Sequence, residues 1–183
     1  SNNTGIGDHA LNANTGDRNT ALGHAALQQN TTADNNTAVG YQALTAATTG
    51  NKNVAIGAYT ADAITTGISN TAVGEQSMRN LTTGARNVAI GQGTLSGSST
   101  ASNNTAVGQA ALNANTSGGS LTAVGRNALT SNTTADDNTA IGVEAMASNT
   151  TGEYNTAVGY AALTSNTTAR DNSALGYKAL EGN

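Results

Sequence analysis

The sequence predicts an all-β protein, a parallel β-solenoid in which each coil of the chain lies on the one before it. Two observations carry this prediction. A motif of the type Asn-Thr-Ala-Val-Gly, as at residues 36–40, recurs along the whole chain, and its closing glycine returns after 16 residues once and after 17 residues in every later copy. The residues before each glycine alternate with period two and are rich in β-branched types, which is typical of strands.

Eleven copies form one predicted repeat domain that covers residues 1–183, and the glycines that close them are Gly7, Gly23, Gly40, Gly57, Gly74, Gly91, Gly108, Gly125, Gly142, Gly159 and Gly176. A strand of about five residues is too short to be stable alone, and no hairpin turn connects neighbouring copies. Parallel pairing of each strand with the strands of the adjacent coils removes both problems. Coils that rise roughly 4.8 Å each would give a rod about 50 Å long.

Within each coil, the closing glycine is expected at a sharp corner, because glycine tolerates a positive φ. The Ala-Leu pair that follows it predicts a second short strand, and segments such as Thr-Thr-Gly-Asn-Lys at 48–52 have the composition of turns. One helical turn at 25–29 is an alternative for a single Ala-Leu segment. The glycines, asparagines and threonines between copies make a longer helix costly.

Side chains one and two residues before the glycine point to opposite faces of the strand. We expect the first set inside the coil, together with leucines from its other side, and these predicted core residues are Val39, Ile56, Val73, Ile90, Val107, Val124, Ile141, Val158, Leu44, Leu112, Leu129 and Leu163. The second set is alanine in ten successive coils, which predicts a face that another subunit approaches closely. This predicted oligomer interface consists of Ala21, Ala38, Ala55, Ala72, Ala89, Ala106, Ala123, Ala140, Ala157 and Ala174.

The composition argues against several classes of protein. Leu, Ile and Val account for only 26 of the 183 residues, yet the formal net charge is only −4, so the chain lacks the high charge of a disordered one. Seven Lys and Arg residues scattered over an acidic chain argue against nucleic acid as a partner. No apolar run approaches the roughly 20 residues of a membrane span. Because the chain has no Cys, it can form neither a disulfide nor a thiolate metal site.

Copies such as Val54-Ala55-Ile56-Gly57, followed three residues after the glycine by a small residue, resemble the head repeats of YadA-type trimeric autotransporter adhesins. Similar repeats occur in bacteriophage tail-fibre proteins and bacterial surface proteins. The resemblance implies a left-handed parallel β-roll, three chains around one axis, and a role in attachment outside the cell, on a cell surface or a virion fibre. The repeat of 17 residues is longer than the usual one, which predicts a wider coil.

We expect no catalytic, cofactor-binding or metal site, and therefore no enzyme. The two histidines, His9 and His24, stand at variable outward positions. Asp136 and Asp137 form the one adjacent carboxylate pair, in a turn where Asx hydrogen bonds explain acidic residues without calcium. Outward tyrosines either anchor a ligand or are ordinary surface residues, and they are Tyr41, Tyr59, Tyr160 and Tyr177. Asn-Thr-Thr matches the glycosylation sequon at 30–32, 132–134, 149–151 and 166–168, as expected by chance in so Asn- and Thr-rich a chain.

The first functional hypothesis is a structural or adhesive fibre module, a rigid homo-oligomeric rod for which the resemblance favours a trimer. The first copy starts by residue 3 and the last runs to Leu180, so we expect open strand edges at both ends, as in a longer array or an end-to-end filament. The alternative is an ice-binding protein in which paired threonines, such as Thr48 and Thr49, stack into hydroxyl columns. Adjacent residues point to opposite faces of a strand, which counts against one flat array.

Overall fold

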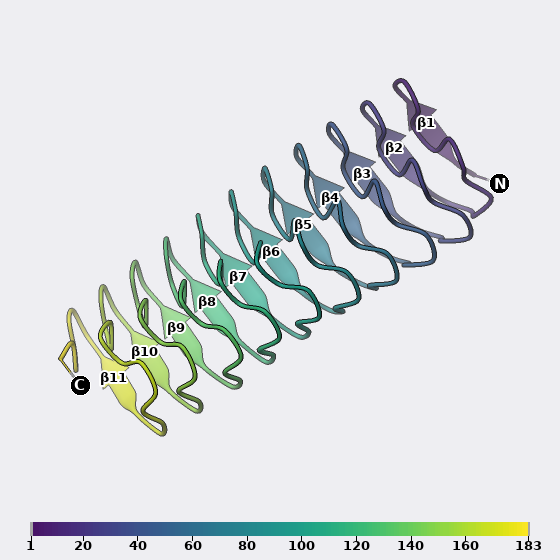
Figure 1. The fold of residues 1–183 in the computed structure, drawn as a ribbon. Helices are drawn as coiled ribbons and strands as arrows, with labels where there is room; N and C mark the ends of the chain where they lie inside the picture. Colours follow the sequence, from purple (N-terminus) through teal and green to yellow (C-terminus); the bar gives the residue numbers. More distant parts are fainter. Residues whose placement is uncertain (1, 183) are drawn as a thin grey trace.

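The computed structural model describes residues 2–182 as one rod of stacked coils (Figure 1). In this range every coil contributes one three-residue strand, and the eleven strands pair in chain order into a single parallel sheet. The strands are β1 (Thr4–Ile6), β2 (Thr20–Leu22), β3 (Thr37–Val39), β4 (Val54–Ile56), β5 (Thr71–Val73), β6 (Val88–Ile90), β7 (Thr105–Val107), β8 (Thr122–Val124), β9 (Thr139–Ile141), β10 (Thr156–Val158) and β11 (Ser173–Leu175). The predicted parallel β-solenoid with coils of about 17 residues is confirmed.

The closing glycines form the corner that ends each strand, with φ angles between 120° and 141°. At Gly74, where φ is 120°, a Cβ atom would lie 2.7 Å from the carbonyl carbon of Gly91 in the next coil. Both the backbone angle and this close approach require glycine. The strict period of the sequence therefore reflects a contact between the backbones of successive corners.

The segment after the corner is a series of turns, so the prediction of a second strand is wrong. Gln42 and Leu44, two and four residues after Gly40, have φ angles of 54° and 50°. Their amides still bond between coils: the Gln42 N–H donates to the His24 carbonyl (2.9 Å), and the Leu44 N–H donates to the Thr60 carbonyl (3.1 Å). Alternating left-handed residues turn the chain while keeping these bonds, which the extended backbone of a strand could not do.

The structure reverses the predicted inner and outer faces of the strands. The alanines that we expected at an oligomer interface are buried inside the coil, and they are Ala21, Ala38, Ala55, Ala72, Ala89, Ala106, Ala123, Ala140, Ala157 and Ala174. The β-branched residues that we expected in the core point outward and are at least partly exposed, and they are Val39, Ile56, Val73, Ile90, Val107, Val124, Ile141 and Val158. Leu44, Leu112, Leu129 and Leu163 are fully buried opposite the alanines.

The width of the coil explains this reversal. In the first coil Gly5 occupies the alanine position, and a Cβ atom added there would lie 3.4 Å from Leu11 Cδ1. A methyl group therefore fills the space opposite the leucine, and a valine or isoleucine would overpack it. Size, rather than hydrophobicity, decides which face of the strand is buried.

A column of asparagines precedes the strands in every coil but one, and these asparagines are buried except in the first and last coils. The Asn70 N–H donates to Asn53 Oδ1 (3.0 Å), Asn70 Nδ2 donates to the Gly84 carbonyl (2.9 Å), and Asn70 Oδ1 accepts the Asn87 N–H (3.0 Å). Asn70 thus joins three coils through its backbone and side chain together, which satisfies polar groups that burial would otherwise leave without partners. Leu121 replaces asparagine in one coil and offers no amide to the next coil.

Candidate interaction surface on the outer sheet face

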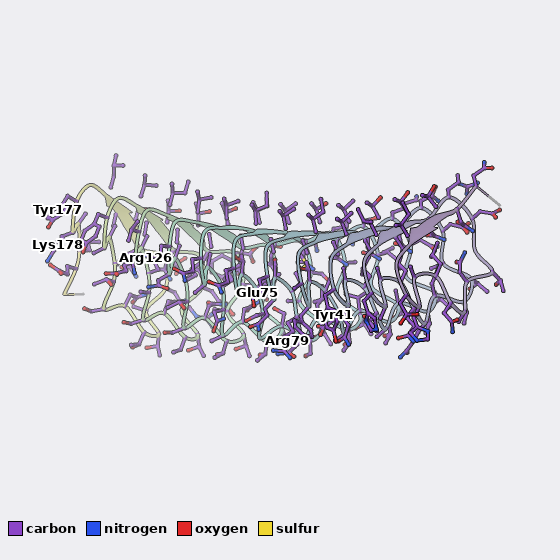
Figure 2. The ribbon with its side chains drawn as sticks, turned by 90° about the horizontal axis from the view of Figure 1, so that it is seen from above. Tyr41, Glu75, Arg79, Arg126, Tyr177 and Lys178 are labelled. Carbon is purple, nitrogen blue, oxygen red and sulfur yellow. The ribbon has the colours of Figure 1, made fainter. Side chains whose placement is uncertain are left out.

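The outward side of the sheet forms a regular surface along the rod, here called the outer sheet face. It consists of two columns of side chains, from the first and third residue of every strand. The first column holds Thr4, Thr20, Thr37, Val54, Thr71, Val88, Thr105, Thr122, Thr139, Thr156 and Ser173, and the second holds Ile6, Leu22, Val39, Ile56, Val73, Ile90, Val107, Val124, Ile141, Val158 and Leu175. Figure 2 shows this row of side chains standing away from the sheet along the whole rod.

The outer sheet face carries no charge, and its second column is entirely apolar while its first column consists mostly of threonines. Ile56 and Ile90 are each 41% exposed and Ile141 is 39% exposed, although they lie in the middle strands of a regular sheet. The face contains only Thr, Ser, Val, Ile and Leu, whereas the rest of the surface is mostly polar. A contiguous exposed apolar patch of this kind is typical of a surface that binds a partner.

The apolar character is greatest at the centre of the rod. In β4 and β6 the threonine of the first column is replaced by Val54 and Val88, so both columns are apolar in these strands. Between them β5 contributes Thr71 and Val73. Contacts at the centre of an interface contribute most of its binding energy, so these strands form its expected core.

Aromatic side chains line the flank of the rod beyond the corner glycines. The ring centroids of His24 and Tyr41 lie 5.1 Å apart at an interplanar angle of 12°, and Tyr59 continues the row 5.2 Å from Tyr41. Arg79 Cζ lies 5.5 Å from the centroid of the Tyr59 ring. The labelled Tyr41 and Arg79 lie away from the outer sheet face in Figure 2. Because these rings stack on one another from coil to coil, part of their surface is already occupied within the chain.

The same flank contains the partly buried carboxylate of Asp62. Asp62 Oδ1 is buried and has no hydrogen-bond partner, and Arg79 Nε lies 3.9 Å from Asp62 Oδ2. Burial raises the pKa of Asp62 above its usual value of 3.8, although Arg79 and two backbone amides oppose this shift. A desolvated carboxylate of this kind destabilises the fold at neutral pH.

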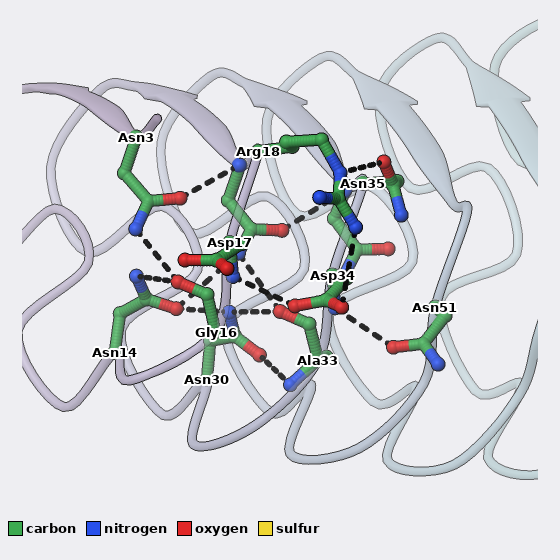
Figure 3. A network of polar contacts seen from close by, with 12 residues as sticks. Asn3, Asn14, Gly16, Asp17, Arg18, Asn30, Ala33, Asp34, Asn35 and Asn51 are labelled. Atoms are coloured by element: carbon green, nitrogen blue, oxygen red, sulfur yellow. Dashed lines mark hydrogen bonds and ion pairs between the residues drawn. The ribbon is translucent and has the colours of Figure 1, made fainter. Parts of the chain in front are cut away.

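The polar turns of the rod are used to join coils. The Asp17 N–H donates to Asp34 Oδ1 (2.7 Å), the Asp34 N–H donates to Asn51 Oδ1 (2.8 Å), and Arg18 Nη2 lies 3.5 Å from Asp34 Oδ2 (Figure 3). Asp136 Oδ1 likewise accepts the N–H of Gly119 from the coil before (2.6 Å). The carboxylates of Asp34 and Asp136 therefore accept hydrogen bonds from backbone N–H groups of the coil before.

The histidines do not assemble a metal site. His9 Nε2 lies 3.6 Å and His24 Nε2 lies 3.8 Å from Asp8 Oδ2, and all three side chains are largely exposed. Within residues 2–182, no cluster of three or more metal-ligating side chains is present. The same part of the chain contains no pocket, and no helix in it is long and apolar enough to span a bilayer.

The paired threonines separate into two roles. In six of the seven pairs the first residue donates its hydroxyl to a carbonyl in the next coil, as Thr31 does to Thr48 (3.0 Å) and Thr150 to Thr167 (3.0 Å), while the second residue is exposed. The two hydroxyls of a pair therefore do not share one flat array. The asparagines of the Asn-Thr-Thr sequons are buried in the folded chain, and they are Asn30, Asn132, Asn149 and Asn166.

The alternation before each glycine is the sequence signal for the outer sheet face, but the side of Val and Ile faces outward and the side of Ala is buried, opposite to the expectation. A search of family models, curated proteins and solved structures found no match to the chain.

Proposed function

We propose that the chain is a structural module of an extracellular fibre, a rigid rod whose copies associate side by side through the outer sheet face. The observation that carries this proposal is the uncharged row of Thr, Val and Ile side chains along eleven strands. In this assembly the sheet is covered on both sides, as is usual for parallel sheets. The resemblance to adhesin head repeats supports three copies around one axis, and it supports a role in attachment on a cell surface or a virion fibre.

The size of the face is sufficient for such an assembly. Eleven strands of three residues span roughly 500 Å² at ordinary strand spacing and rise, so two apposed faces bury about 1,000 Å² in total. That value lies at the lower limit for a specific interface. In a ring of copies, contacts at the borders of the face add to this area.

A matched pair of substitutions tests the proposal. Ile90 on the outer sheet face and Ile68 on the turn before β5 are 41% and 42% exposed, so neither is needed to fill the core. Ile90→Lys places a charge at the centre of the proposed interface and is expected to convert the oligomer to monomers in sedimentation velocity. Ile68→Lys is expected to leave the oligomer intact. Equal masses for the wild type and both variants would refute the proposed role of the face.

Ice binding through the outer sheet face, and not through the paired threonines, is a second candidate function. The specific observation is the first column, in which eight threonines stack in register at strand spacing next to a column of Val and Ile. A flat and regular array of methyl and hydroxyl groups can order water at its surface. This function requires the face to be free of protein partners. Thermal hysteresis and ice shaping by a monomeric chain would support it, and their absence would exclude it.

A further inference from the structure

We propose that two copies of the chain associate antiparallel along the turns that precede the strands, so that Lys52 of each copy faces Asp137 of the other. This contact goes beyond the proposed function, because it uses no residue of the outer sheet face and joins rods through a second surface. It is carried by the charges at the tips of these turns, which are complementary when one of the two rods is reversed.

The tip of each turn carries one exposed side chain, two residues before the strand that follows. These residues form the tip row, and in the order of β2 to β11 they are Arg18, Asn35, Lys52, Ser69, Arg86, Asn103, Ser120, Asp137, Tyr154 and Asp171. All of them have left-handed φ angles, between 56° and 62°. Figure 3 shows Arg18 and Asn35 as neighbours in this row, where Arg18 Nε donates to Asn35 Oδ1 (2.8 Å).

Backbone hydrogen bonds between coils fix the height of the tips along the rod. The Lys52 N–H donates to the Asp34 carbonyl of the coil before (3.1 Å), and the Asp137 N–H donates in the same way to the Gly119 carbonyl (3.2 Å). Successive tips are therefore separated by one strand spacing, about 4.8 Å. A second molecule that approaches this edge meets charges at fixed and regular positions.

The charges of the tip row change sign halfway along the rod. The half that precedes β2 to β6 contains Arg18, Lys52 and Arg86. The half that precedes β7 to β11 contains Asp137 and Asp171. Within residues 2–182, Lys52, Asp137 and Asp171 take part in no ion pair, so each of them can pair with a second molecule.

A two-fold axis perpendicular to the rods, placed between β6 and β7, brings opposite charges together. Lys52 belongs to β4, two strands before β6, and Asp137 belongs to β9, two strands after β7, so the pair forms twice in the contact. Arg18 before β2 and Asp171 before β11 are matched in the same way. The edge is therefore complementary to itself, as a contact between two identical copies requires.

Other arrangements of the same edge lose these pairs. Two parallel copies at the same height would place Lys52 against Lys52 and Asp137 against Asp137. An antiparallel copy shifted by one coil would place Lys52 opposite Ser120 or Tyr154, and the match between the outer charges would be lost as well. The charges therefore select both the orientation and the register of the second copy.

Like charges in the contact are few, and most are neutralised within each chain. Beside the tip row, Asp34 faces Glu153 of the second copy. Arg18 Nη2 lies 3.5 Å from Asp34 Oδ2, and Arg170 Nη2 lies 3.2 Å from Glu153 Oε2. At the centre, Arg86 of each copy lies one coil from Arg86 of the other, so Arg86→Ser is expected to strengthen the association.

Charge reversal tests the pairing, in the background of Ile90→Lys, which is designed to remove association through the outer sheet face. Lys52→Glu and Asp137→Lys are each expected to weaken self-association about tenfold in sedimentation equilibrium at low salt, because each places like charges at both pairs. A mixture of these two variants is expected to associate, since both pairs then have opposite charges. Glu75→Lys, an equal change of charge at an exposed residue beyond the corner, is the control and is expected to have no effect.

The same experiment separates this contact from the proposed function. At about 0.5 M salt the contact between tip rows is expected to be largely lost, so the masses that test the outer sheet face are compared under that condition. A background variant that is monomeric at low salt, or one whose association is unchanged by both charge reversals, would overturn the antiparallel contact. Neither result affects the proposed role of the outer sheet face.

Cysteines at Ser69 and Ser120 test the orientation, in a chain that has no Cys of its own. A mixture of Ser69→Cys and Ser120→Cys variants is expected to form disulfide-linked dimers on a non-reducing gel, because these tips face each other in the antiparallel contact. Ser69→Cys alone is expected to remain uncrosslinked, since its two copies would lie three coils, about 14 Å, apart. Cross-linking of Ser69→Cys alone, or none in the mixture, would overturn the proposal.

Discussion

At the scale of single residues, the backbone contact between corners is the most restrictive feature of the fold. The closing glycines combine a large positive φ with a carbonyl of the next coil directly beside the Cα atom. Other positive φ angles in the coil are near 55° and are held by ordinary side chains, such as Ala25 and Leu27. A Cβ atom would also collide with the next coil at turn glycines such as Gly50 and Gly84, but only the corner glycines combine such a collision with a positive φ.

A pair of glycine substitutions measures this restriction. Gly74→Ala is expected to destabilise the fold by about 3 kcal/mol, because the new Cβ would strain the backbone and collide with the next corner. Gly93→Ala is expected to cost only about 1 kcal/mol, because its φ of 63° carries the ordinary left-handed penalty while the nearest atom is 3.8 Å away and no collision is added. Urea denaturation of both variants checks the difference, and equal losses would contradict the corner contact.

Asp62 gives a prediction about pH. Its folded pKa is raised above the unfolded value by burial, so ionisation at neutral pH opposes folding, and this penalty is relieved as the pH falls through the folded pKa towards 3.8. Asp62→Asn is therefore expected to raise the melting temperature at pH 7, with a gain that shrinks in acid. Glu75→Gln, at an exposed carboxylate, is the control. A gain for Asp62→Asn that is independent of pH would argue against the buried charge as its cause.

At the scale of elements, the asparagine column adds hydrogen bonds between coils, because three-residue strands are too short to supply many of them. A strand of this length has few ladder bonds, and each buried asparagine adds bonds to the coils on both sides. Leucine at position 121 shows that one coil tolerates the loss of such bonds when an apolar side chain of similar size replaces the amide.

Asn70→Leu tests the column. It removes the acceptor of the Asn87 N–H and the donor to the Gly84 carbonyl, and it is expected to cost about 1–3 kcal/mol because these buried groups lose their partners. Leu121→Asn is the matched reverse change, for which added hydrogen bonds and lost apolar burial are expected to cancel to within about 1 kcal/mol. Thermal unfolding of both variants checks this asymmetry. Costs of equal size would show that the column has no special role.

The same elements show what the sequence could and could not predict. The strands, their parallel order and their register follow from the period, because a fixed spacing places equivalent residues on top of one another. The faces of the strands could not be assigned from hydrophobicity, because Ala72 and Val73 are both apolar and the narrow coil selects the smaller one. The turns with left-handed leucines and alanines could not be predicted either, because these residue types have no preference for a positive φ.

At the scale of the whole molecule, the rod is a sum of nearly equivalent layers. Each coil bonds only to its neighbours, as in other solenoids, so the length of the rod depends on the number of coils. The side-chain columns continue through every layer, and the outer sheet face is therefore as long as the rod.

Deletion of one complete repeat tests whether the length of the rod depends on the number of coils. Removal of residues 104–120 joins Asn103 to Leu121, keeps all columns in register and removes no charged residue. The shortened chain is expected to fold and to have a maximum dimension about 5 Å smaller in small-angle X-ray scattering. Removal of residues 104–111 alone shifts the later columns out of register and is expected to reduce cooperative unfolding. A rod of unchanged length after the full deletion would contradict the stacked arrangement.

Coverage of the outer sheet face by further copies of the chain, as proposed above, determines the mass of the particle in solution. Multi-angle light scattering of the unmodified protein over a series of concentrations measures this mass. We expect a discrete species with an integral multiple of the 18.0 kDa chain mass, and three copies if the resemblance to trimeric repeats extends to the assembly. A constant mass of 18.0 kDa throughout the series would mean that the face is not covered by other copies.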